Sequence, residues 1–152
     1  MSGVEEFLRR QSEIIDRVGW AVTLVHPDAD DAGDSTPFAY TVGLTAHGHP
    51  ELLIAGLDPA TAQQLLNDLA TRVYDRAERF SDGQRVGDLI AGHDAVIIDG
   101  TATDQLYPGA AIARYDQQVR LQQILWPDPQ GHLPGEAGYA YPPSVQPVIR
   151  RA

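Results

Sequence analysis

The chain has 152 residues, of which 43% are hydrophobic, and it carries a formal net charge of −10. This composition is typical of a globular domain with its own core and excludes intrinsic disorder. The absence of cysteine and lysine excludes disulfides, thiolate chemistry, cysteine-ligated zinc and lysine Schiff bases. The acidic charge disfavours nucleic acid as a partner, and no apolar run reaches the roughly 20 residues of a membrane span.

The beginning of the chain, from Met1 to Arg10, contains four charged side chains and lacks an apolar signal stretch. We therefore expect a cytoplasmic protein. Cationic side chains that are all arginine, together with many alanines, are typical of a GC-rich bacterial genome. No repeat or linker divides the sequence, so we expect residues 1–152 to form a single domain.

The first predicted element is an amphipathic helix from Gly3 to Val18. Ser2 and Glu5 match a capping box, apolar residues follow at spacings of three and four, and Gly19 suits the end of a helix. A strand is predicted from Trp20 to Val25, which is rich in bulky and β-branched residues.

An acidic segment from Asp28 to Thr36 follows and carries four aspartates. Its spacing resembles the start of a calcium-binding loop. However, Ala32 and Ala39 occupy the fifth and twelfth positions, where an EF-hand requires a ligand and its glutamate. We therefore predict a solvated turn whose stability does not respond to millimolar calcium.

The clearest strand pattern extends from Pro37 to Thr45, and a second strand from Glu51 to Leu57 completes a predicted hairpin. The first strand has a large apolar face and a uniformly small face that includes Thr41 and Gly43. A small face admits either another element, a packed helix or a crossing strand, or a flat ligand close to the backbone, and we favour the packed element.

Asp58 and Pro59 supply an N-cap and a first-turn proline for a second helix, predicted to extend to Arg79. Its apolar stripe, which includes Leu69, is predicted to pack onto the sheet. The later elements are a helical turn at 89–90, a strand at 94–99, a hairpin partner at 101–107, a helical piece at 110–115 and a strand at 119–126. These patterns predict an α+β fold: a largely antiparallel, curved sheet or partial barrel covered by two main helices, with a proline-rich extended arm at 128–152.

The densest group of ligand-type side chains is His47-Gly48-His49-Pro50-Glu51. In extended backbone, His47, His49 and Glu51 share a face, and two imidazoles with a carboxylate suit a divalent metal. The alternative is a tight turn in which these residues are structural. The candidate pocket residues are His26, Tyr40, Thr41, Gly43, His47, His49, Glu51 and Trp126.

Several short motifs occur in order: Gly19-Trp20, Phe38 to Leu44, His49 to Leu52, Trp126 to Asp128, and Gln146-Pro147. Together they resemble the bacterial family labelled domain of unknown function 4262, over Val18 to Pro147. The resemblance implies no established reaction, cofactor or catalytic residue.

The order of strand, turn, strand and helix from Phe38 to Arg79 also looks like the opening of flavin-binding split barrels, in which a Gly-x-Pro turn joins two strands. Gly48-His49-Pro50 fits that turn. Three functions follow as hypotheses. The first is a non-catalytic module that binds an unknown small molecule or protein. The second is a metal-assisted or histidine-based enzyme at the His47–Glu51 turn, and the third is a binder of a flavin-type flat cofactor.

Overall fold

The computed structural model describes residues 3–26, 36–90 and 92–151. Most of the predicted acidic loop, and with it the prediction about calcium, lies outside the described residues. The elements are α1 (Gly3–Val18), β1 (Ala21–Val25), β2 (Phe38–Val42), the 3-10 turn η1 (Thr45–His47), β3 (Glu51–Ala55), α2 (Pro59–Arg76), β4 (Arg85–Ile90), β5 (His93–Thr101), α3 (Gly109–Tyr115), the 3-10 turn η2 (Asp116–Gln118), β6 (Leu121–Leu125) and β7 (Arg150–Arg151).

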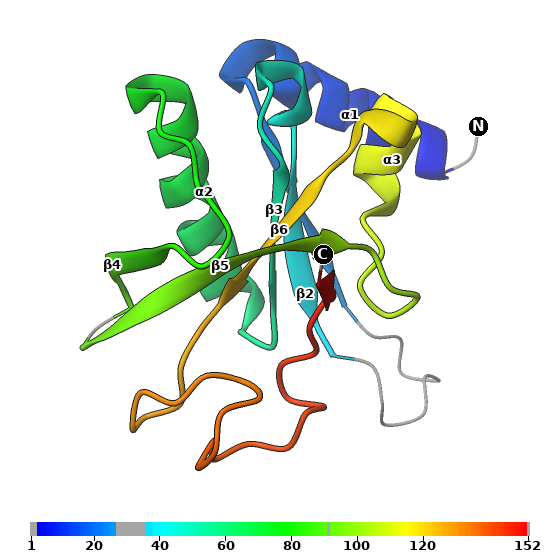
Figure 1. Cartoon of the computed structure of the whole chain (residues 1–152). Coiled ribbons are helices and arrows are strands. Elements are labelled where there is room, and N and C mark those ends of the chain that lie inside the picture. The colour runs from blue at the N-terminus through cyan, green and yellow to red at the C-terminus, as the bar shows by residue number, and fades with distance from the viewer. Residues whose placement is uncertain (1–2, 27–35, 91, 152) are drawn as a thin grey trace.

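A mixed sheet of seven strands forms the centre of the molecule (Figure 1). Its order is β1-β2-β3-β6-β5-β4, and β7 pairs with β5. The pairing of β3 with β6 is parallel, whereas the other pairings are antiparallel. The α+β class is confirmed, but the sheet is not closed into a barrel.

Helices cover both faces of this sheet, with α2 on one face and α1 and α3 on the other (Figure 1). The predicted small face of β2 packs against α2, and Ala39 belongs to the same buried cluster as Leu66 and Leu69. The opposite face of β2, with Phe38 and Tyr40, forms a second cluster with residues of α1 and α3. The expectation of two covering helices is therefore incomplete, because α3 is a third.

The two long helices form where the local signals place them. The bounds of α1 match the prediction, and the Asp58 carboxylate accepts a hydrogen bond from the Thr61 backbone N–H at the start of α2. α2 ends at Arg76, earlier than predicted, because Ala77 adopts a left-handed conformation (φ 54°) and its N–H bonds the Arg72 carbonyl. The chain then turns so that Phe80 still enters the α2-side core.

The second half of the sheet differs from the prediction. The segment predicted as a helical turn at 89–90 belongs to β4, and the predicted hairpin partner at 101–107 is mostly loop. β5 is longer than expected and pairs with β4 on one side and β6 on the other. β4 pairs with β5, the next strand along the chain, and β5 also pairs with the more distant β6, so strand pairing and not local propensity decides these elements.

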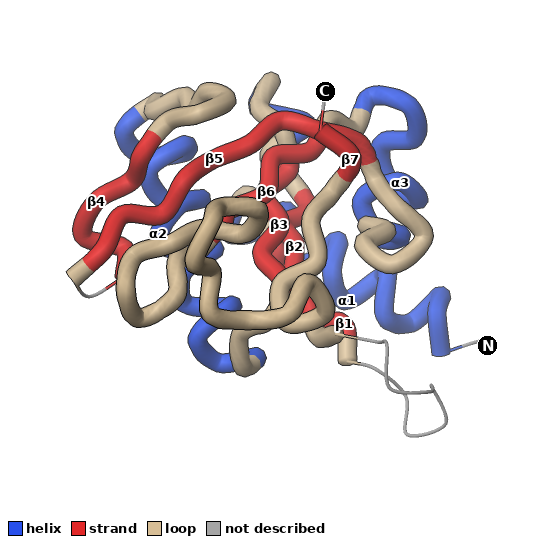
Figure 2. Tube along the Cα trace, turned by 60° about the horizontal axis from the view of Figure 1, so that its bottom comes forward, coloured by secondary structure: helices blue, strands red, loops and turns tan. Residues whose placement is uncertain are grey.

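The C-terminal arm wraps the end of the molecule opposite the β2–β3 hairpin turn and returns to β5 through β7 (Figure 2). The buried carboxylate of Asp128 organises its first turn by accepting hydrogen bonds from the backbone N–H groups of Gln130, His132 and Ala140. Among the described residues, no helix combines the length and apolar character that crossing a membrane requires.

Candidate functional site

The β2–β3 hairpin turn contains the residues that the sequence singled out. The ladder between the two strands ends at the pair Tyr40 and Leu53. Beyond it the backbone N–H of Leu52 bonds the hydroxyl of Thr41 instead of a carbonyl. The strands separate at this point, and the side chain of Glu51 fills the space between them.

The Glu51 carboxylate is fully buried and is surrounded by hydrogen-bond donors. It accepts bonds from the hydroxyls of Thr41 and Thr45 and from the backbone N–H groups of Gly43, Leu44 and Thr45. Burial raises the pKa of Glu51, and these hydrogen bonds oppose that rise. The N–H groups are obligate donors, so both oxygens act as acceptors that hold the turn in shape.

The neighbouring backbone tolerates no side chain at Gly43. Its φ is +131°, and a Cβ atom there would lie 2.4 Å from the Gly19 carbonyl oxygen. The hydroxyl of Tyr74, from α2, lies 2.8 Å from the carbonyl oxygen of Gly19 and 2.9 Å from that of Gly43. Tyr74 therefore joins the start of β1 to the end of β2.

His49 is buried and uses both ring nitrogens inside the fold. Nδ1 lies 2.8 Å from the Pro50 carbonyl oxygen, and Nε2 lies 3.2 Å from the Phe80 backbone nitrogen. Because the Phe80 N–H is a donor, Nε2 is the acceptor and Nδ1 carries the proton. Burial lowers the pKa of His49, which agrees with a neutral ring that ties the hairpin to the segment after α2.

His47 is exposed, and its ring stacks on Tyr74 with a centroid distance of 4.1 Å. His47 is therefore the more exposed of the two histidines. His47, His49 and Glu51 make separate contacts: His47 with an aromatic ring, His49 with Phe80 and Pro50, and Glu51 with the turn backbone. Within the described part of the chain, no group of three or more His, Cys, Asp or Glu side chains is arranged to hold a metal ion.

The remaining candidate residues do not join this turn. His26 is exposed and follows the end of β1 that pairs with Phe38, so it lies at the opposite end of the sheet. The Tyr40 hydroxyl accepts a hydrogen bond from the Ala110 backbone N–H on the α3 side. Trp126 is buried near the C-terminal arm, where its indole N–H bonds the Ala55 carbonyl.

A separate cavity of about 340 Å³ lies between the end of β5, the α3–η2 segment and the start of β6. Its volume falls in the lower part of the range for small-molecule sites. Apolar side chains form much of its wall, and exposed polar residues line the part of the cavity that reaches the surface. The lining residues are Gly100, Thr101, Ala102, Pro108, Ile112, Asp116, Gln117, Val119, Arg120 and Leu121.

One residue of this wall has an unusual backbone conformation. Asp116 has φ 55° and ψ −129°, a combination that side-chain-bearing residues rarely adopt. Strained backbone of this kind occurs preferentially at functional sites. The sequence offered no signal for this cavity, because its residues come from three segments that only the tertiary fold brings together.

The fold and this end of the sheet define an α+β domain with a hairpin turn built around a buried glutamate. The model of the family described as domain of unknown function (DUF4262) matches residues 14–140. The chain belongs to this family, as its ordered motifs predicted. Comparisons with curated proteins and with solved structures gave no match.

Proposed function

We propose that this domain is a non-catalytic binding module that holds a small organic molecule in the cavity between β5, α3 and β6. The observation that supports the proposal is the cavity itself, with its volume of about 340 Å³ and its mixed wall. Ala102, Ile112 and Val119 offer apolar contact, while Thr101 and Gln117 supply hydrogen-bonding groups at its edge. Apolar walls with a few polar groups are typical of small-molecule sites.

The hairpin turn also supports a non-catalytic function. His49 and Glu51 have the residue types of acid–base chemistry, yet their polar atoms bond neighbouring groups of the fold. A general base must reach the proton that it abstracts. We therefore assign these two residues to the architecture of the turn and place the ligand in the cavity.

A fragment screen by ligand-observed NMR tests this proposal. The matched variants are Ala102→Phe, which places a large side chain at the cavity wall, and Ala60→Phe, which changes an exposed alanine in the first turn of α2. We expect weakly apolar fragments with one or two polar groups to bind the wild type and Ala60→Phe, and to lose most of their binding to Ala102→Phe.

Denaturant unfolding of both variants shows whether they are folded. Fragments that bind a folded Ala102→Phe variant as well as they bind the wild type would contradict the assignment of the cavity. A complete lack of binding fragments for the wild type would contradict the proposed function.

A further inference from the structure

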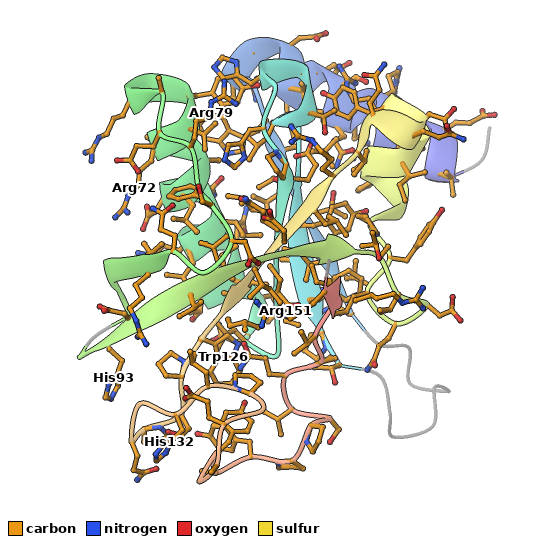
Figure 3. The ribbon with its side chains drawn as sticks, in the orientation of Figure 1. Arg72, Arg79, His93, Trp126, His132 and Arg151 are labelled. Atoms are coloured by element: carbon orange, nitrogen blue, oxygen red, sulfur yellow. The ribbon has the colours of Figure 1, made fainter. Side chains whose placement is uncertain are left out.

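Two arginines from distant parts of the chain meet at the hairpin turn. Arg79 follows α2, and Arg120 immediately precedes β6. The Nη1 of Arg79 lies 2.8 Å from the carbonyl oxygen of Gly48, and the Nη2 of Arg120 lies 3.1 Å from the same oxygen. Figure 3 shows Arg79 at the end of the molecule opposite Trp126.

Gly48 ends the 3-10 turn η1 in a left-handed conformation. Its φ is +73°, and the nearest atoms to a Cβ built there are the two terminal nitrogens of Arg79, at 3.7 and 3.8 Å. The turn presents this carbonyl oxygen to both guanidinium groups. One carbonyl oxygen accepts one N–H from each, so most of the ten N–H donors of the two side chains remain available.

Neither guanidinium forms an ion pair with a carboxylate in the described part of the chain, whereas Arg10 and Arg114 do. Both side chains are exposed, so they are accessible from solvent. Two adjacent positive charges repel each other unless an anion lies between them. The arrangement thus has the charge, the donors and the access that an oxyanion requires.

The charge of the whole molecule restricts the size of that anion. A net charge of −10 opposes the approach of any anion at long range, and it opposes polyanions such as nucleic acids most strongly. Contacts at short range must supply the affinity. Guanidinium groups provide them through paired N–H donors that match the oxygens of phosphate.

We propose that Arg79 and Arg120 form a binding site for a small phosphate-bearing anion above the Gly48 carbonyl. The two guanidinium groups approach the phosphate oxygens from different elements, one from the segment after α2 and one from the start of β6. The site is distinct from the binding function proposed for the cavity, although Arg120 also contributes to the cavity wall.

His49 provides an internal reporter of the bound anion. Burial lowers its pKa, a hydrogen bond to the Pro50 carbonyl raises it, and the charges of Arg79 and Arg120 lower it further. A phosphate anion beside the two arginines offsets part of their charge. Its binding therefore raises the pKa of His49, which a pH series of the imidazole NMR resonances, recorded with and without phosphate, follows.

The test is a titration of the full chain with inorganic phosphate at pH 8, with sodium chloride at matched ionic strength as the reference. The variants are Arg79→Gln, Arg120→Gln and, as a control, Arg85→Gln, which changes an exposed arginine on β4. We expect saturable phosphate binding to the wild type and to Arg85→Gln. Each of the other two variants should bind about tenfold more weakly, because a charged hydrogen-bond partner is lost.

The Arg79→Lys variant keeps the positive charge and loses the paired N–H donors. Its affinity for phosphate should lie between those of the wild type and Arg79→Gln. Thermal unfolding without phosphate shows that each variant is folded. The proposal would be overturned if Arg79→Gln, Arg120→Gln and Arg79→Lys bound phosphate as tightly as the control Arg85→Gln. It would also be overturned by a response to sodium chloride or sodium acetate as strong as the response to phosphate, or by a His49 pKa that phosphate leaves unchanged.

Discussion

Single residues at the β2–β3 turn decide how this end of the sheet is built. Glu51 replaces the missing part of a strand ladder, because its two oxygens satisfy donors that the separated strands leave unpaired. His49 fixes the turn against the segment after α2. Glu51 and His49, which the sequence marks as chemical candidates, therefore have structural partners for their polar atoms.

Substitution of Glu51 by glutamine tests this structural role. The amide group has nearly the same size, but its NH₂ faces donors wherever it is placed. Leaving a buried donor without an acceptor costs about 1–3 kcal/mol, and we expect Glu51→Gln to lower the free energy of unfolding by at least that much. Denaturant unfolding measures the change, with Glu13→Gln on the exposed face of α1 as the control. A loss of stability no larger than that of the control would show that the hydrogen bonds to the Glu51 carboxylate contribute little to the free energy of unfolding.

His49 should make stability depend on pH. In the unfolded chain its pKa is near the ordinary value of 6.5, whereas burial lowers the pKa in the native state. The unfolded state therefore binds more protons than the native state just below pH 6.5, and the free energy of unfolding falls as the pH decreases through that range. His49→Gln should show a shallower fall between pH 7 and pH 5. Parallel curves for the two proteins would disprove the assignment of a neutral buried imidazole.

At the scale of elements, α2 carries most of the packing on its face of the sheet. Leu66 and Leu69 are fully buried in a cluster that also contains residues of β2, β3, β5 and β6. The small side chains on β2 allow the helix to approach closely. This face of β2 admits a packed element or a flat ligand, and α2 occupies it.

Leu69→Ala measures the strength of that packing. Because Leu69 has no exposed surface, its truncation should lower the free energy of unfolding by roughly 2–5 kcal/mol. Gln63→Ala, on the exposed side of the same helix, serves as the control and should change stability by less than about 0.5 kcal/mol. A change in Leu69→Ala as small as that would show that this face of α2 is not part of the core.

Local signals predicted the elements that depend on local chemistry. Apolar spacing defined α1, the Asp58 cap defined the start of α2, and alternation defined the β2–β3 hairpin. The parallel pairing of β3 with β6 depends on a partner far away in sequence, so local patterns missed it, whereas β4 pairs with the next strand, β5, and part of it was misassigned as a helical turn. The candidate site shows the same division: the turn residues stood out in the sequence, and the cavity residues did not.

At the scale of the whole molecule, the parallel pair β3–β6 connects the two regions of interest. It places the start of β6 beside the hairpin turn, where Glu51 N–H bonds the Arg120 carbonyl. The same stretch of β6, together with β5 and α3, encloses the cavity. The cavity and the hairpin turn therefore share Arg120, which lines the cavity and bonds the Gly48 carbonyl.

Mapping of amide chemical shifts is the most direct measurement of the proposed binding site. The isotope-labelled wild-type protein is titrated with the strongest fragment from the screen. We predict that the shifted amides cluster at 100–102, 112 and 116–121, which line the cavity. Shifts concentrated instead in the broad surface hollow between residues 102–105 and the C-terminal arm at 143–151, or scattered over the molecule, would contradict binding in the cavity.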